Sequence, residues 1–307
     1  MEIGLVVHPS NPVGESIRVL TEFAGRQRRT LVARESDAER VGPGVGLVSD
    51  DMFADRVDAL VALGGDGTML AAMRLVVGRP VPVLGVNHGN VGFLVEVTPA
   101  ELPDALNRLV DGRFTLEPHS CLDAVCPDSG EATVAFNDVV LTAAEPWASL
   151  TADLVVNGSR HGYYRGDAVI ACTPTGSTAY NYAAGGPIVS PSAPSITLTP
   201  VAPMAGISRP VVLGGADVVG VGGADIPLRY VVDGAISGTL APGATLTVRL
   251  RPDAVSVVRL DADTHIARSR VKLSLLDLPL KPDQLLELIP ARLREELRST
   301  REAATGD

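Results

Sequence analysis

At its most informative point the chain reads Ala59-Leu60-Val61-Ala62-Leu63-Gly64-Gly65-Asp66-Gly67-Thr68. The apolar residues at 59–63 predict a buried strand, and Met69, Leu70 and Met73 follow at helical spacing. The glycines between them let backbone N–H groups approach a phosphate chain at the start of the helix, where the helix dipole favours negative charge. The segment therefore predicts a strand, a glycine loop and a helix arranged to bind phosphate.

Asp66 is the only ionisable side chain in this loop. A carboxylate is a poor ligand for phosphate itself. Its chemical role is therefore either to bind the Mg²⁺ that accompanies a nucleotide or to take a proton from an attacking hydroxyl. The structural alternative is a tight turn closed by the aspartate side chain. That alternative does not readily account for an acid set among three glycines.

Two further units of strand and helix flank this segment. Ile3–Val7 is a short apolar run followed by helical spacing at residues 17–23, and Val81–Val86 precedes a helical pattern over Pro99–Val110. Alternating strands and helices imply a parallel sheet. We therefore predict a three-layer α/β domain over residues 1–113.

The pattern changes near Phe114. From there short β-rich runs alternate with turn signals such as Asp233-Gly234, and 16 of the 23 prolines lie after residue 113, as the edges and turns of a β domain require. We predict a mostly antiparallel β-rich domain over residues 114–275. The last apolar-periodic segment, Asp283–Arg298, predicts a helix that packs back on the α/β domain, so that residues 276–307 complete that domain.

The composition and net charge of the chain disfavour several classes of protein. The net charge of −10 disfavours a protein that grips nucleic acid or anionic membrane, and five Phe, five Tyr and one Trp supply no visible stacking platform for single strands. No apolar stretch approaches the ~20 residues that cross a bilayer, and no signal peptide is evident, so we expect a cytoplasmic protein. The three cysteines lack C-x-x-C spacing, so we expect no disulfide framework, zinc site or other resident metal site.

Two later segments carry polar side chains that suit a nucleotide. Thr173–Tyr180 offers many hydroxyl groups at low bulk, suited to ribose hydroxyls and amide groups, and is followed by Gly185-Gly186-Pro187. Helix capping accounts for the same hydroxyl residues about equally well. Phe136-Asn137-Asp138-Val139 sets an amide beside a carboxylate in an otherwise apolar strand, for which a turn or edge position is the alternative.

These three segments, in this order, resemble the NAD kinase family, whose members phosphorylate the 2′-hydroxyl of the adenosine ribose of NAD to make NADP. The glycine–aspartate loop alone also resembles loops of 6-phosphofructokinases and lipid kinases, whereas Thr173–Tyr180 and Gly85–Leu94 are more specific. The resemblance runs from about residue 59 to 235. It implies an α/β nucleotide-binding domain, a β-sandwich-like dinucleotide-binding domain, NAD between them, and ATP with Mg²⁺ or polyphosphate as donor. It also implies a homodimer or homotetramer.

The resemblance implies roles for individual residues. Asp66 is the expected catalytic proton acceptor and an NAD contact, and Phe93 flanks the adenine. Asn137 and Asp138 hold ribose hydroxyls. The expected phosphate loop comprises Gly64, Gly65, Gly67 and Thr68. Gly67 is also an expected NAD contact, at the phosphates, and Arg165 and Asp167 are expected near the base or nicotinamide end. The remaining expected NAD contacts are Thr175, Thr178, Ala179, Tyr180, Asn181, Tyr182, Ala183 and Ala202.

The chain departs from the family pattern at four places, one of which is Asn90, after Gly89, where the family commonly has a basic residue or His. Asp138 stands where the family commonly has Glu, Ala168 where it usually has Gly, and Met204-Ala205 where it often has His-Ser. A Cβ at Ala168 would crowd a close backbone approach. Two alternatives to an NAD kinase therefore stay open: a related kinase that phosphorylates a different nucleotide or polyol hydroxyl, and a non-catalytic dinucleotide sensor.

Overall fold

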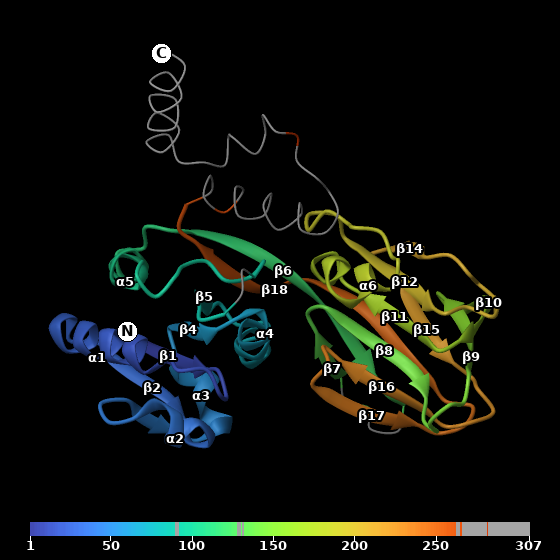
Figure 1. Cartoon of the computed structure of the whole chain (residues 1–307), viewed down its shortest axis with the longest axis horizontal. Coiled ribbons are helices and arrows are strands. Elements are labelled where there is room, and N and C mark those ends of the chain that lie inside the picture. The colour runs from blue at the N-terminus through green and yellow to red at the C-terminus, as the bar shows by residue number, and fades with distance from the viewer. Residues whose placement is uncertain (90–91, 128–129, 131, 262–264, 266–280, 282–307) are drawn as a thin grey trace, which may run out of the picture.

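The computed structural model describes residues 1–89, 92–127, 130, 132–261, 265 and 281. It consists of a parallel sheet flanked by helices and a larger body of antiparallel strands (Figure 1). None of the helices in these ranges is long and apolar enough to cross a membrane. The helix predicted at 283–298 lies outside the described residues.

The first half of the chain forms the parallel sheet that the apolar runs predict. Its strands are β1 (Glu2–Val7), β2 (Thr30–Arg34), β3 (Gly46–Val48), β4 (Ala59–Gly64) and β5 (Pro82–Asn87). They lie in the order β5-β4-β1-β2-β3, and each neighbouring pair is parallel. The helices are α1 (Gly14–Gln27), α2 (Ala38–Val41), α3 (Asp50–Arg56), α4 (Asp66–Leu75) and α5 (Leu102–Val110), with a 3-10 turn η1 (Glu35–Asp37).

Helices cover both faces of this sheet. On one face Leu20 of α1 and Leu106 of α5 belong to a single apolar cluster with β1 and β4. On the other face Phe53 of α3 and Met73 of α4 pack with Leu60 of β4. Every residue of β4 is buried, as a strand covered on both faces requires. The predicted three-layer α/β arrangement is confirmed.

The second half packs a six-stranded antiparallel sheet against the antiparallel part of a 12-stranded sheet, which β18 joins to the parallel strands of the first half. Its elements are β6 (Thr115–Val125), β7 (Ala132–Ala135), β8 (Asp138–Ala143), β9 (Leu150–Val156), β10 (Ser159–Gly166), β11 (Ala168–Cys172), η2 (Thr175–Thr178), α6 (Tyr180–Ala183), β12 (Ser195–Val201), β13 (Ala205–Gly206), β14 (Val211–Gly214), β15 (Val218–Gly222), β16 (Leu228–Val232), β17 (Ile236–Leu240) and β18 (Thr245–Arg259). One sheet has the order β14-β12-β11-β8-β16-β17, and β10, β9, β15 and β18 lie side by side in the other. Leu141 and Leu198 of the first sheet share a core with Leu154 and Val221 of the second. The predicted β-sandwich-like half is confirmed.

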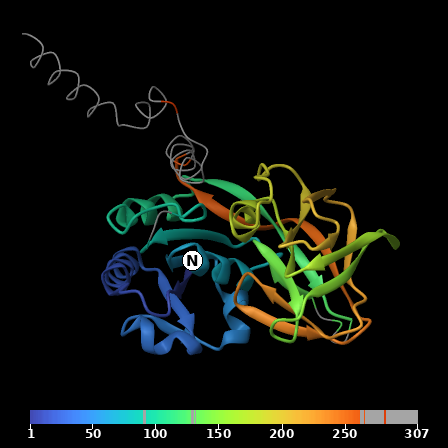
Figure 2. The same cartoon turned by 45° about the vertical axis from the view of Figure 1, so that its right-hand side comes forward.

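β18 connects the two halves. It runs beside β6 from the β-rich half to the α/β half (Figures 1 and 2). Near its start Leu246 belongs to the β-rich core, whereas Val257 belongs to the α/β core and pairs parallel with Val83 of β5. We therefore propose that the two domains, residues 1–113 and 114–275, share β18.

Candidate active site

Asp66 begins α4, directly after the strand and glycine loop. Its carboxylate accepts the backbone N–H of Phe93 at 2.9 Å and that of Leu94 at 3.1 Å. A Cβ on Gly92 would overlap Asp66 Oδ1, so the segment approaches this closely only because residue 92 is glycine. The partners lie 27 and 28 residues downstream, and the carboxylate therefore links the end of β4 to the segment that follows β5.

The glycines of the loop serve two different purposes. A Cβ on Gly64, the last residue of β4, would overlap the buried Thr68 side chain, so this glycine permits close packing behind the loop. A Cβ on Gly65 or Gly67 would meet no atom within 4 Å. These two glycines therefore leave open the space into which a ligand can approach the backbone.

A cavity of about 420 Å³ opens beside the loop, and we call it the loop cavity. Gly65 and Gly67 line it together with Arg34 and Arg40, and each arginine donates to the buried carboxylate of Asp37 at 2.8 Å. Two guanidinium groups beside a helix N-terminus favour a polyanion such as a triphosphate. Neither arginine belongs to one of the sequence motifs, so no local signal in the sequence marks them as site residues.

A second cavity, of about 480 Å³, lies at the start of β8 and is called the β8 cavity. It is lined by Asn137 and Asp138 together with Ala179 and Tyr180, so it joins two of the segments quoted from the sequence. Burial, and then the nearby charge of Asp233, raise the pKa of Asp138 to about 7. This carboxyl group can therefore donate as well as accept a hydrogen bond near neutral pH.

A third cavity, of about 330 Å³, lies between the two halves and is called the interdomain cavity. Phe93 and Leu94 line it from the α/β half, and Thr175 and Thr178 line it from the β-rich half. The two residues that donate to Asp66 thus face this cavity, while its glycine neighbours face the loop cavity. Asp66 lines neither cavity itself, but it lies between the residues that line the two.

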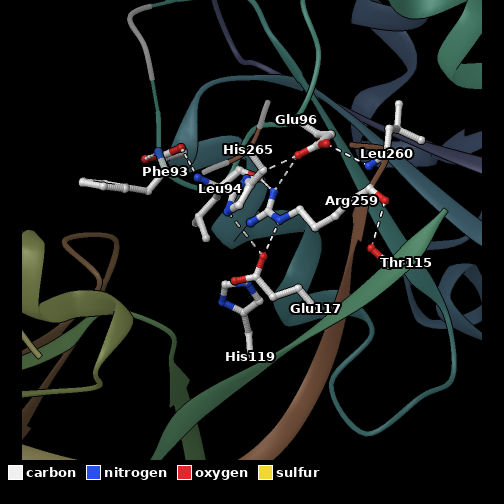
Figure 3. Close-up of polar contacts among 10 residues, drawn as sticks. Phe93, Leu94, Glu96, Thr115, Glu117, His119, Arg259, Leu260 and His265 are labelled. Atoms are coloured by element: carbon white, nitrogen blue, oxygen red, sulfur yellow. Dashed lines mark hydrogen bonds and ion pairs between the residues drawn. The ribbon is translucent and has the colours of Figure 1, made fainter. Parts of the chain in front are cut away.

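Arg259, the last residue of β18, is the centre of a buried charged cluster beside the interdomain cavity (Figure 3). Its guanidinium lies 3.2 Å from the Glu96 carboxylate and also pairs with Glu117. It donates to the carbonyl oxygen of Leu94 at 3.0 Å. The backbone of Leu94 therefore donates to Asp66 on one side and accepts from Arg259 on the other.

Two histidines extend this cluster along the cavity wall. His119 Nε2 lies 3.4 Å from Glu117 Oε1, and its Nδ1 lies 3.4 Å from Thr175 Oγ1. His265 Nε2 lies 3.6 Å from Glu117 Oε2. Burial opposes ionisation of Glu117, but the hydrogen bond with His119 and the charge of Arg259 lower its pKa to about 2. The cluster thus reaches the hydroxyl of Thr175, an expected NAD contact.

Several predicted contacts lie away from these cavities. Arg165, Asp167 and Ala202 are exposed near the β10–β11 connection, where Asp167 N–H donates to Val201 O at 3.0 Å. Ala183 is exposed in α6. None of the four predicted residues lines the loop, β8 or interdomain cavity. Their contacts with NAD stay predictions.

Asn181 supports the hydroxyl-rich segment from inside. It is fully buried, and its amide N–H groups donate to the carbonyls of Ser177 and Pro187, each at 3.0 Å. Its amide oxygen accepts the Thr199 hydroxyl at 2.6 Å. The structure therefore places Asn181 behind the segment, and Tyr182 is half-buried in the same short helix.

The residues that depart from the family pattern differ in burial and in their position relative to the cavities. Ala168 is buried in β11 and belongs to a small apolar cluster with Val140 and Cys172, against which Val201 packs. Met204 is 62% exposed and lies outside the three cavities. Asn90 lies outside the described residues. Of the altered positions that the structure describes, only Asp138 therefore lines a cavity that holds other predicted residues.

The chain matches known proteins along most of its length. Residues 4–114 match the family model of the ATP-NAD kinase N-terminal domain, and residues 136–260 match that of the ATP-NAD kinase C-terminal domain. A protein named NAD kinase from Gemmatimonas aurantiaca is 42% identical over 281 residues, which cover 89% of this chain and 96% of that protein. An NAD kinase from Hahella chejuensis is 33% identical over 253 residues, which cover 80% of this chain and 86% of that protein.

Two solved structures share the fold. Yeast NADH kinase complexed with NADH superposes with a TM-score of 0.79 at 24% identity, covering 92% of this chain and 89% of that one. An NAD kinase from Archaeoglobus fulgidus in complex with ATP superposes with a TM-score of 0.70 at 22% identity. The match covers 90% of this chain and 99% of that one. The resemblance inferred from the motifs is confirmed by the family matches and the identity to curated relatives: this chain belongs to the ATP-NAD kinase family.

Proposed function

We propose that this protein transfers the γ-phosphoryl group of ATP to the 2′-hydroxyl of the adenosine ribose of NAD, giving NADP and ADP. The observation that carries the proposal is the position of Asp66, between a cavity with two arginines and a cavity lined by Phe93 and Thr175. A phosphoryl donor in the loop cavity would meet, at this carboxylate, an NAD molecule that spans the interdomain and β8 cavities, with Asn137 and Asp138 facing its ribose.

In the proposed reaction Asp66 accepts the proton of the 2′-hydroxyl as its oxygen attacks the γ-phosphorus. The new oxygen–phosphorus bond forms while the bond from the γ-phosphorus to the β–γ bridging oxygen breaks, and ADP leaves with that electron pair. The two backbone N–H groups that hold Asp66 fix the direction of its carboxylate. Most of the rate enhancement then comes from positioning and neutralisation of phosphate charge.

We propose that Mg²⁺ enters with ATP as part of the substrate. Arg34 and Arg40 supply positive charge on the protein side of the loop cavity. Within the ranges that the structure describes, no three His, Cys, Asp or Glu side chains gather as a metal site. Polyphosphate carries the same repeating charge as a triphosphate, and NADH carries the same ribose as NAD. Both belong in the assay as alternative donor and acceptor.

The same family relationship leads us to propose a cytoplasmic homodimer or homotetramer. The Trp147 side chain is fully exposed and Met204 is 62% exposed, while the Ser149 hydroxyl lies 3.6 Å from the Met204 sulfur. Apolar side chains this exposed favour burial against another subunit. Light scattering on the purified chain measures the subunit number directly.

The test of the proposed activity is the substitution Asp66→Asn, which keeps the size of the side chain, removes the proton acceptor and leaves one oxygen to accept a backbone N–H. We expect turnover with NAD and MgATP to fall by about 10²–10⁴-fold while NAD binding, measured by calorimetry, changes by less than about threefold. Asp51→Asn, at an exposed position of α3, is the matched control and keeps wild-type turnover. Absence of NADP formation by the wild-type protein would overturn the proposal. NADP binding without turnover would instead favour a sensor.

A further inference from the structure

One buried carboxylate holds the segment that carries Asn137 and Asp138. Asp233 directly follows β16, whose last residue pairs with Val139 of β8. Its Oδ1 accepts the backbone N–H of Asn137 at 2.7 Å and that of Asp138 at 3.0 Å, and its Oδ2 accepts that of Phe136 at 2.9 Å. The side chain is 0% exposed, so these three successive donors replace solvent around the charge.

The fourth partner of this carboxylate comes from the other half of the chain. Arg74 Nη2 donates to Asp233 Oδ2 at 2.6 Å, and the arginine side chain is 17% exposed. Arg74 lies in the last turn of α4, and Asp66 begins the same helix. At 1.5 Å per residue the two positions are about 12 Å apart along the helix axis. One helix therefore carries Asp66 at one end and the ion pair with Asp233 at the other.

The Asn137–Asp138 segment is held on its other side by the β-rich half. The Thr173 hydroxyl donates to the carbonyl of Phe136 at 2.6 Å, and Thr173 N–H donates to that of Asn137 at 2.9 Å. Both of these bonds are made within the β-rich half. The Arg74–Asp233 pair, by contrast, ties the segment directly to the helix of Asp66 across the two halves.

We propose that Arg74 and Asp233 are positioning residues, whose ion pair sets the place of the Asn137–Asp138 segment relative to Asp66. This inference rests on the proposed function, because it assigns to the pair the distance between the ribose of NAD and the proton acceptor. In-line transfer depends steeply on that distance, since a displacement of about 1 Å can lower the rate about 100-fold. The pair suits this task because its carboxylate is fully buried, so solvent cannot readily replace Arg74 as the partner of Asp233.

The first experiment compares Arg74→Met with Arg74→Lys in steady-state assays of NADP formation. We expect Arg74→Met to lower kcat about 10- to 100-fold and to raise the KM for NAD, with the KM for MgATP within about twofold of wild type. Arg74→Lys is expected to recover much of kcat, because the pair uses a single N–H donor that an ammonium group can supply. Arg79→Met is the matched control: Arg79 follows α4 and pairs with Asp55 on the surface, and its loss leaves kcat unchanged.

A purely structural pair gives a different pattern. Loss of Arg74 would then lower the folded fraction but leave kcat per folded molecule and the KM for NAD at wild-type values. That result, or Arg74→Lys no better than Arg74→Met, would overturn the inference. The comparison uses ratios to wild type, so a wild-type protein that makes no NADP contradicts the proposed function and is recognised separately.

The second experiment reads the geometry without using activity. Asp233→Asn replaces one carboxylate oxygen by an amide NH₂, which faces donors instead of accepting from them. Hydrogen exchange of the full chain should show faster exchange at Phe136, Asn137 and Asp138 in Asp233→Asn. Arg74→Met should give a smaller increase at the same amides. Unchanged protection of these amides in folded Asp233→Asn would contradict the proposed support of the segment.

Discussion

At the scale of single residues, Gly92 determines how closely the chain can surround Asp66. The carboxylate of Asp66 is held by the N–H groups of the next two residues, Phe93 and Leu94. Any side chain at position 92 would occupy the place of an Asp66 oxygen. The glycine is therefore needed for the direction of a carboxylate and not for a turn.

The substitution Gly92→Ala tests this point. We expect the added methyl group to displace the Asp66 carboxylate and lower kcat at least about tenfold, because the rate depends on the position of the proton acceptor relative to the attacking hydroxyl. The fold is expected to persist, as judged by circular dichroism and a cooperative thermal transition. Gly25→Ala in α1 is the control, since a Cβ at this position would meet no atom within 4 Å. The activity of this variant should equal that of wild type. Full activity of Gly92→Ala would show that Asp66 has no need of its present orientation.

At the scale of elements, β18 brings a buried cation to the wall of the site. Arg259 is 5% exposed and faces Glu96, which is 3% exposed, as well as Glu117. On the same strand Arg251 binds both oxygens of Asp123 but its side chain is 42% exposed. The two arginines therefore differ mainly in their own exposure, and of the two only Arg259 pairs with a carboxylate, that of Glu96, that is almost fully buried.

This difference predicts unequal losses of stability. Arg259→Met leaves the buried carboxylate of Glu96 and the partly buried one of Glu117 without their guanidinium partner, and we expect the free energy of unfolding to fall by about 3–5 kcal/mol. Arg251→Met removes a pair that is partly solvated, and we expect a loss of at most about 1 kcal/mol. Urea denaturation of both variants measures the two values. Equal losses would show that burial of the Arg259 cluster does not increase its contribution to the free energy of unfolding.

At the scale of the whole molecule, two shifted carboxyl groups oppose each other in the dependence of stability on pH. The pKa of Asp138 is raised from 3.8 to about 7, so the folded chain keeps a proton there that the unfolded chain releases above pH 3.8. Its contribution to stability is therefore lost as the pH rises toward 7. The pKa of Glu117 is lowered from 4.5 to about 2, so its contribution is present above pH 4.5 and is lost as the pH falls toward 2.

Asp138→Asn is expected to remove the first of these contributions. The variant should gain stability relative to wild type as the pH rises from 5 to 8, because its amide never has to ionise in the buried site. Thermal unfolding of both proteins at pH 5, 6.5 and 8 provides the measurement. Asp225→Asn, at an exposed position, should keep the wild-type profile. Parallel profiles for wild type and Asp138→Asn would refute the role assigned to Asp138.

Local features of the sequence predicted the elements that carry the candidate site and the polar segments that line its cavities. The apolar run at 59–63, the glycine loop and the helical spacing after it identify β4 and α4, because strand and helix periodicity and the need for glycine are properties of neighbouring residues. The hydroxyl-rich segment Thr173–Tyr180 and the Asn137-Asp138 pair were recognisable for the same reason. Both segments line cavities in the folded chain.

The charged partners of these motifs emerge only from the tertiary structure. Arg74 meets Asp233 across 159 residues, and Arg259 meets Leu94 across 165. In the sequence Asp233 precedes a glycine and marks a turn, and each arginine resembles an ordinary surface residue. Burial and long-range contact give these residues their roles, and both depend on how strands distant in the chain pair along β16 and β18. The sequence by itself therefore determined the motifs and the fold class, whereas the packing of the two halves decided which charges hold those motifs in place.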